Sequence, residues 1–147
     1  MKSGIFVCPL CWEPLLPPGM EPLREGTALA ARWDLLVLTP EGCRCLEETQ
    51  PVCRQLLVPG DCPPELVRRA AAETVVTYGM SCRDSLTYSS LEEPVLCVQR
   101  RLPRPDGNIV ELQEIPLPPL PGPAEELLPL LGARLLQMPL AAPLLSW

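Results

Sequence analysis

Two pairs of cysteines have the spacing in this sequence that most suggests chemistry. Cys8 and Cys11 form a Cys-Pro-Leu-Cys motif, and Cys43 and Cys45 form a Cys-Arg-Cys motif further along the chain. Two close thiol pairs can complete a tetrahedral zinc site, with each sulfur about 2.3 Å from the ion. The second pair departs from the usual Cys-x-x-Cys spacing, and free cysteine is commonly a small apolar core residue. The sequence therefore makes zinc a candidate cofactor on these four residues, with metal-free core packing as the alternative.

A second group of reactive residue types lies at residues 81–85, where two serines, a cysteine and an aspartate stand close together. The chain contains no histidine, which excludes Ser-His-Asp and Cys-His nucleophiles within it. Its only lysine is Lys2, and no Gly-x-x-x-x-Gly-Lys motif occurs, which excludes a P-loop. We therefore expect a structural role, in which Gly79 lets the backbone leave a strand while Ser81 and Asp84 close local turns. No enzyme activity is predicted.

The charge balance and the apolar runs limit the partners and the compartment. The formal net charge is −6, and the densest basic group, Arg100, Arg101 and Arg104, stands among glutamates. A nucleic-acid surface needs clustered Lys and Arg to displace counterions, so we expect no nucleic-acid partner. The N-terminus lacks the apolar core of a signal peptide, which predicts a cytoplasmic protein with reduced thiols. No apolar run reaches the roughly 18 residues of a membrane span, so no transmembrane segment is expected.

The clearest structural unit is a strand, a helix and a second strand between residues 56 and 78. A continuous apolar run at residues 35–38 first predicts a strand buried on both faces. Residues 56–58 predict the next strand, and a helix should follow, capped by Asp61 or Cys62 and ending near Glu73. The short apolar run at residues 74–78 then predicts a second strand parallel to the first, and we expect the crossover between them to be right-handed.

Beyond residue 79 the pattern changes to exposed, alternating strands. Residues 95–102 alternate apolar and polar side chains, and Pro105-Asp106-Gly107-Asn108 has the composition of a tight turn. The two flanks should form an antiparallel hairpin, with Val110 and Leu112 on its buried face. The expected fold class is therefore α/β, a small mixed sheet with one β-α-β unit and an antiparallel β-hairpin extension.

These patterns divide the chain into four segments. They are an irregular segment rich in Cys and Pro (residues 1–32), an α/β domain (33–116), a Pro-rich linker (117–123) and a Leu-rich helix or tail (124–147). The leucine stripe of the last segment is too apolar to stay solvated. We expect it to pack on its own sheet, and the alternative is a helix in a partner's groove.

Several short motifs between residues 75 and 122 share a common pattern. They are Tyr78-Gly79, the polar strand at residues 84–90, Asp106-Gly107, Pro121-Gly122 and the helix after Ala124. This stretch resembles the later part of the central domain of Mur ligases, the ATP-dependent enzymes that extend the peptidoglycan stem peptide. The chain lacks that family's Gly-rich nucleotide loop, its Asn-His steps and its carbamylated lysine, and Pro123 stands where His-Asn is usual. The resemblance thus implies a stand-alone remnant to which no catalytic residue carries over.

The sequence as a whole predicts a non-catalytic, cytoplasmic binding or scaffolding module. It would bind a partner protein or a small ligand through the edge of its sheet. The alternative is a structural or regulatory module with a zinc site made of four cysteines. An enzyme that uses Asp84 or a cysteine is the third and weakest interpretation.

Overall fold

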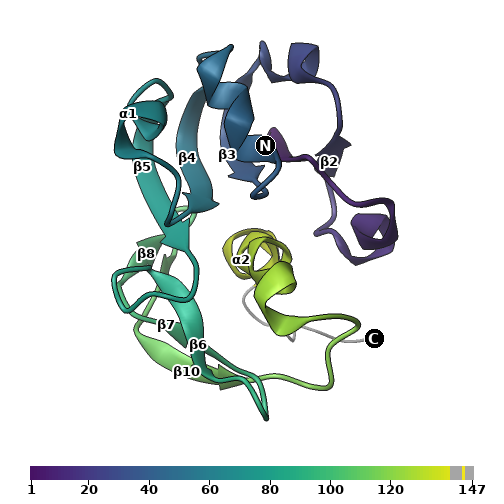
Figure 1. Ribbon diagram of the computed structural model, residues 1–147, viewed down its shortest axis with the longest axis vertical. Helices are drawn as coiled ribbons and strands as arrows, with labels where there is room; N and C mark the ends of the chain where they lie inside the picture. The colour runs from purple at the N-terminus through teal and green to yellow at the C-terminus, as the bar shows by residue number, and fades with distance from the viewer. Residues whose placement is uncertain (140–143, 145–147) are drawn as a thin grey trace.

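An eight-stranded, mostly parallel sheet organises the chain in the computed structural model, which describes residues 1–139 and Leu144 (Figure 1). Its strands are β1 (Ser3–Phe6), β2 (Met20–Leu23), β3 (Arg32–Leu38), β4 (Val52–Pro59), β5 (Ala71–Tyr78), β6 (Leu86–Ser90), β7 (Val95–Val98) and β10 (Gln113–Pro116). They lie in the order β10-β7-β6-β5-β4-β3-β1-β2. Strands β1 to β6 pair in parallel, while β7 is antiparallel to both β6 and β10. The expected α/β class with a mixed sheet is confirmed.

The predicted β-α-β unit is present, but its helix is much shorter than expected. Helix α1 (Pro64–Val67) has only four residues and joins the parallel strands β4 and β5. The predicted end near Glu73 is wrong, because β5 already begins at Ala71, which pairs with Val52. No side chain caps the helix, and its N-cap is Pro63 instead of the predicted Asp61 or Cys62. The long β4 strand provides backbone partners for residues 71–73, and this pairing prevails over their helix propensity.

The N-terminal segment, predicted to be irregular over residues 1–32, contributes two strands to the sheet. β1 lies between β2 and β3 and is parallel to both. All four residues of β1 are buried, and a Cβ at Gly4 would lie 2.7 Å from Leu23 Cδ1. Strands of only four residues among prolines give no recognisable period, so pairing determines them: β1 pairs with the longer β3, and β2 pairs with β1.

Each face of the sheet has its own core. One face packs against α2 (Leu128–Gln137), the preceding 3-10 helix η4 (Ala124–Leu127) and the 3-10 helix η1 (Leu10–Leu15). The other packs against α1 and the 3-10 helices η2 (Gly26–Leu29) and η3 (Gly42–Glu47). Figure 1 shows α2 enclosed by the curved sheet. Through Gln137, the Leu-rich segment therefore packs on its own sheet, as expected, and residues 140–143 and 145–147 lie outside the described part.

The predicted hairpin forms around the turn at residues 105–108. Strands β8 (Leu102–Pro103) and β9 (Ile109–Val110) pair antiparallel, and Gly107 takes the positive φ of 89° that the turn requires. Val110 is buried as expected, but Leu112 is exposed. That part of the prediction is wrong because β9 ends at Val110, and the alternation of faces is interrupted before β10 begins.

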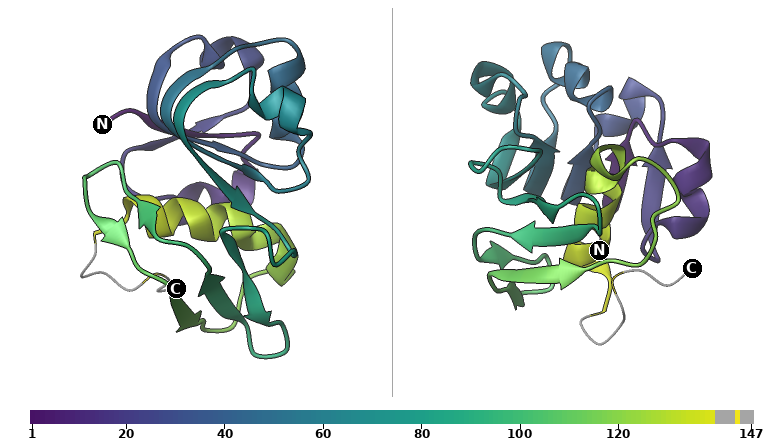
Figure 2. Two further views of the ribbon diagram at one scale, coloured as in Figure 1. Left: turned by 90° about the vertical axis from the view of Figure 1, so that its left-hand side faces the viewer. Right: turned by 60° about the horizontal axis from the view of Figure 1, so that its bottom comes forward.

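A buried arginine fixes this hairpin to helix α2. Arg104 donates to the carbonyl oxygens of Leu135 (2.9 Å) and Met138 (2.6 Å), and it pairs with Asp106 at 3.0 Å. Figure 2 shows α2 between the parallel strands on one side and the antiparallel strands on the other. Within the described residues, no helix has the length and apolar character needed to cross a bilayer.

Candidate ligand-binding site

β1 and β3 are neighbours in the sheet, and at this position the order of the strands reverses, which makes it a topological switch point. From β1 it runs through η1 to β2 on one side, and from β3 it runs through η3 to β4 on the other. The two connections also diverge to opposite faces, because Trp12 of η1 and Leu46 of η3 are buried in different cores. Such a switch point leaves a crevice at the carboxyl ends of the strands, where open α/β sheets commonly bind ligands.

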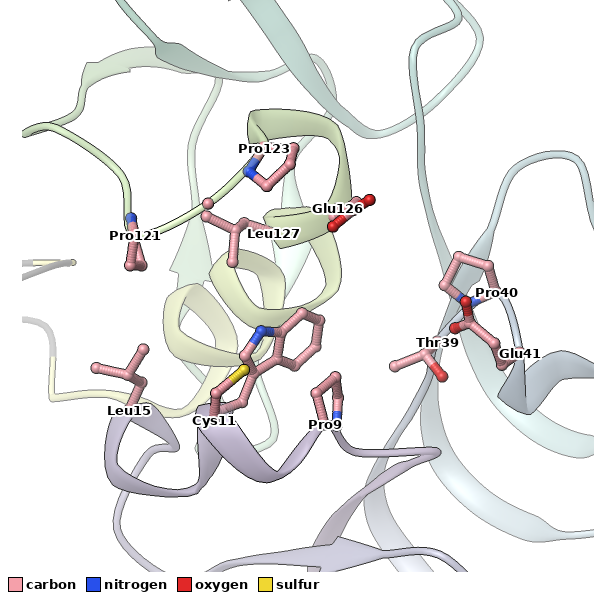
Figure 3. A pocket seen from close by; sticks show the side chains of 12 residues that line it. Pro9, Cys11, Leu15, Thr39, Pro40, Glu41, Pro121, Pro123, Glu126 and Leu127 are labelled. Carbon is pink, nitrogen blue, oxygen red and sulfur yellow. The ribbon is translucent and has the colours of Figure 1, made fainter.

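A cavity of about 410 Å³ lies at this switch point and has three walls (Figure 3). Pro9, Cys11 and Trp12 come from the segment after β1, while Pro40 and Glu41 follow β3. The third wall comes from the segment before α2, with Pro121, Pro123, Glu126 and Leu127. The walls are mostly apolar and rich in proline, whose φ is fixed by its ring. We refer to this space as the first cavity.

Thr39, a buried residue directly after β3, also lines the first cavity. Its hydroxyl lies within hydrogen-bond distance of the carbonyl oxygens of Phe6 (3.1 Å) and Val7 (3.0 Å), and it accepts from the Val7 and Gly42 amides. A Cβ at Gly42 would lie only 2.0 Å from Phe6 O, so glycine is required for this close approach. The ends of β1 and β3 are therefore firmly joined where the crevice begins.

A second cavity, of about 620 Å³, adjoins the first and shares Pro40 with it. It lies at the carboxyl ends of β4 and β5, where Gly60 and Gly79 follow the strands, and its lining includes Asp84. Tyr78 also lines it and donates its hydroxyl to the carbonyl oxygen of Leu38 at 2.6 Å. Burial raises the pKa of this phenol well above its ordinary value, so the hydroxyl stays neutral and braces β5 against β3.

Asp84 closes the turn that the sequence predicts, but its carboxylate does more. The Ser81 amide donates to Asp84 Oδ2 at 3.1 Å, and the Asp84 amide donates to Ser81 O at 3.0 Å. The side chain is only 5% exposed and rests against two glycines. Sequence reasoning missed its position in a cavity, although Gly60 and Gly79, each following an apolar strand, were visible as a signal.

Most of the charged side chains that line the two cavities are acidic. Their carboxylates are Glu41 and Glu126 in the first cavity and Asp61, Asp84 and Glu125 in the second. Among the described residues that line them, Arg83 is the one cation. Their combined charge therefore favours a neutral or cationic ligand over an anionic one.

The four cysteines proposed as zinc ligands lie on different sides of the sheet. Cys8 is buried in the core beneath η1, and Cys11 is exposed in the wall of the first cavity. Cys43 and Cys45 belong to η3 and pack against the other core. In residues 1–139 and 144, no group of three or more Cys, Asp or Glu side chains is arranged to hold a metal ion. The four residues do not fit a single site in this arrangement, and zinc binding stays a prediction.

Burial keeps several of these thiols protonated. It raises the pKa of Cys45 to about 11, and burial together with the neighbouring Cys43 raises the pKa of Cys62 to about 12. Cys62, which the sequence did not single out, thus lies beside Cys43 on the second face. All eight cysteines are free. Because the thiolate is the nucleophile and the metal ligand, these buried thiols have little reactivity.

No protein-family model, curated protein or solved structure matches the chain. The resemblance of residues 75–122 to the Mur ligase central domain stays a prediction. Its motifs Tyr78-Gly79 and Asp84 lie at the second cavity, and its Asp106-Gly107 step forms the hairpin turn.

Proposed function

We propose that this chain is a non-catalytic cytoplasmic module that binds a small ligand in the cleft at the carboxyl ends of its parallel strands. The observation that carries the proposal is the first cavity, which occupies the switch point between β1 and β3. Its volume of about 410 Å³ falls in the range of small-molecule sites, and apolar walls with a few polar groups are typical of them. The proline-rich walls are rigid, so a ligand would lose little affinity to their ordering.

The outer edges of the sheet are less suited to binding than this cleft. The edge strands are β2 and β10, and each contains a proline, Pro22 and Pro116. Proline has no amide hydrogen and therefore interrupts the ladder that an added strand would need. A small ligand in the cleft is for this reason preferred to a partner strand on the sheet edge. The Mur ligase resemblance agrees with this role, since a remnant without catalytic groups would retain binding alone.

Cys11 provides a direct test because it is exposed and lines the first cavity. Cys82 is also exposed but lines neither cavity, so it serves as an internal control. The protein would be alkylated with iodoacetamide in the presence of neutral aromatic compounds such as indole and 2-phenylethanol. A compound that occupies the cavity should slow alkylation of Cys11 several-fold and leave Cys82 unchanged, as measured by peptide mass spectrometry.

A matched pair of variants identifies the cavity as the place of binding. Gly122 lines it, and a Cβ there meets no atom within 4 Å, so Gly122→Trp should fill the cavity without disturbing the fold. Gly26 is equally open but lies outside the cavity, so Gly26→Trp is the control. Protection of Cys11 should disappear in Gly122→Trp and persist in Gly26→Trp. If no compound protects Cys11 selectively, or if Gly122→Trp is protected like the wild type, the proposal is wrong.

A further inference from the structure

Asp84 is a buried carboxylate with one unused oxygen. Its side chain is 5% exposed and lines the second cavity. Oδ2 accepts the Ser81 amide at 3.1 Å, whereas Oδ1 has no hydrogen-bond donor among the described residues. No Lys or Arg of the described part forms an ion pair with it. Oδ1 is not among the fully enclosed polar atoms that lack a partner, so it is open to a hydrogen-bond donor in the second cavity.

The surrounding backbone is shaped to receive this carboxylate. A Cβ at Gly60 would lie 1.7 Å from Oδ1, and a Cβ at Gly79 would lie 2.5 Å from Oδ2. Neither glycine has a positive φ, so the backbone conformation does not require glycine at these two positions. Glycine is needed there because a larger residue would collide with the Asp84 carboxylate. Closing the local turn needs only the contact between Ser81 and one oxygen. The turn therefore does not explain why β4 and β5 are each followed by a glycine that contacts the Asp84 carboxylate.

The charges around Asp84 select the kind of group that it would bind. Asp61 comes from the segment after β4, Glu125 belongs to η4, and both line the cavity with Asp84. Arg83, from the segment before β6, is the opposing charge, and Arg100 binds the Arg83 carbonyl from outside. The balance is negative, which disfavours an anion beside the free oxygen. The same residues do not form a group arranged for a metal ion within the described chain.

We infer that the second cavity binds an organic ammonium group, which donates a hydrogen bond to Asp84 Oδ1. The apolar part of the same ligand extends past Pro40, the residue that both cavities share, into the first cavity. This inference rests on the proposed binding function and names the chemical class of its ligand. Charge-assisted hydrogen bonds of this kind are roughly twice as strong as neutral ones, and the partial burial of the site limits competition by water.

The test compares 2-phenylethylamine with 2-phenylethanol, which has a similar apolar part and no charge. Binding would be followed in amide NMR spectra through Gly60 and Gly79, which line the second cavity. The amine should bind the wild type more tightly than the alcohol does. Asp84→Asn should weaken amine binding about tenfold or more and leave the alcohol unaffected, because a hydrogen bond to a charged group contributes about 1.5–3 kcal/mol. Glu92→Gln removes an exposed charge outside both cavities and should change neither.

Each other outcome is decisive. Equal binding of amine and alcohol, independent of Asp84, overturns the inference while protection of Cys11 would still support the proposed function. Absence of amine binding also overturns it, and the proposed function fails as well only if Cys11 is never protected. Shifts of the same glycine amides with magnesium chloride alone, lost in Asp84→Asn, would assign the site to a metal ion instead. If Asp84→Asn does not fold, the exposed Glu125→Gln must weaken amine binding several-fold for the inference to stand.

Discussion

Replacing Gly60 with alanine tests whether Asp84 occupies the space left by a missing side chain. The new Cβ would lie 1.7 Å from Asp84 Oδ1 and 2.6 Å from its Cγ, so the carboxylate has to move. Gly60 does not have a positive φ, and the alanine backbone itself is therefore unstrained. The second cavity provides room for Asp84 to rotate outward, which means that the main loss is its hydrogen bond with the Ser81 amide.

The expected cost follows from two opposing effects. Losing a hydrogen bond to a charged group costs about 1.5–3 kcal/mol. Replacing glycine with alanine lowers the conformational entropy of the unfolded chain, which stabilises the folded state by about 0.4–1 kcal/mol. The free energy of unfolding should thus fall by about 1–2 kcal/mol, measured by equilibrium urea denaturation. Gly26→Ala is the control, because a Cβ there meets nothing within 4 Å.

A double-mutant cycle separates this mechanism from a general effect on the loop. In an Asp84→Ala background the clash and the hydrogen bond are both absent, so Gly60→Ala should cost nothing there and should even stabilise slightly. The coupling free energy between the two positions should therefore be about 1.5–3 kcal/mol, because the gain from alanine is present in both backgrounds and cancels. If Gly60→Ala costs the same in both backgrounds, Asp84 is not held by the space at Gly60. In that case the backbone does not form a preshaped site for the carboxylate.

Two further predictions concern stability. Arg104→Lys should lower the free energy of unfolding by about 2 kcal/mol, because one ammonium cannot reach Leu135 O, Met138 O and Asp106 together. Arg101→Lys, at an exposed pair with Glu111, should change it by less than about 1 kcal/mol, and equal urea midpoints for the two variants would contradict this anchoring role. Burial raises the pKa of Cys53 from 9.0 to about 11 in the folded state. The resulting contribution to the free energy of unfolding is fully present below pH 9, and it is lost as the pH rises towards 11. Cys53→Ala should reduce the slope of unfolding free energy against pH in that window by up to about 1.4 kcal/mol per pH unit, and an unchanged slope would refute the assignment.

Features that depend on neighbouring residues follow from the sequence alone. The proline-glycine step after residues 56–58 and the short apolar run at residues 74–78 predict the β4–α1–β5 unit, because each pattern is local. Asp106-Gly107 specifies the hairpin turn in the same way, through the positive φ that Gly107 accepts. The absence of histidine and the single Lys2 also limit the available chemistry, whatever the fold.

Features that depend on residues far apart in the sequence are set only by tertiary packing. β1 is a strand because Ser3 pairs with Leu35 and Met20, and the sequence around it carries no period of its own. Residues 71–73 join β5 because β4 provides the hydrogen-bond partners that a helix would otherwise supply internally. The cleft is built from three segments that meet only after folding, and Asp84 gains its buried position from glycines that follow two other strands. Burial and pairing between remote segments are properties of the packed chain, and no local pattern encodes them.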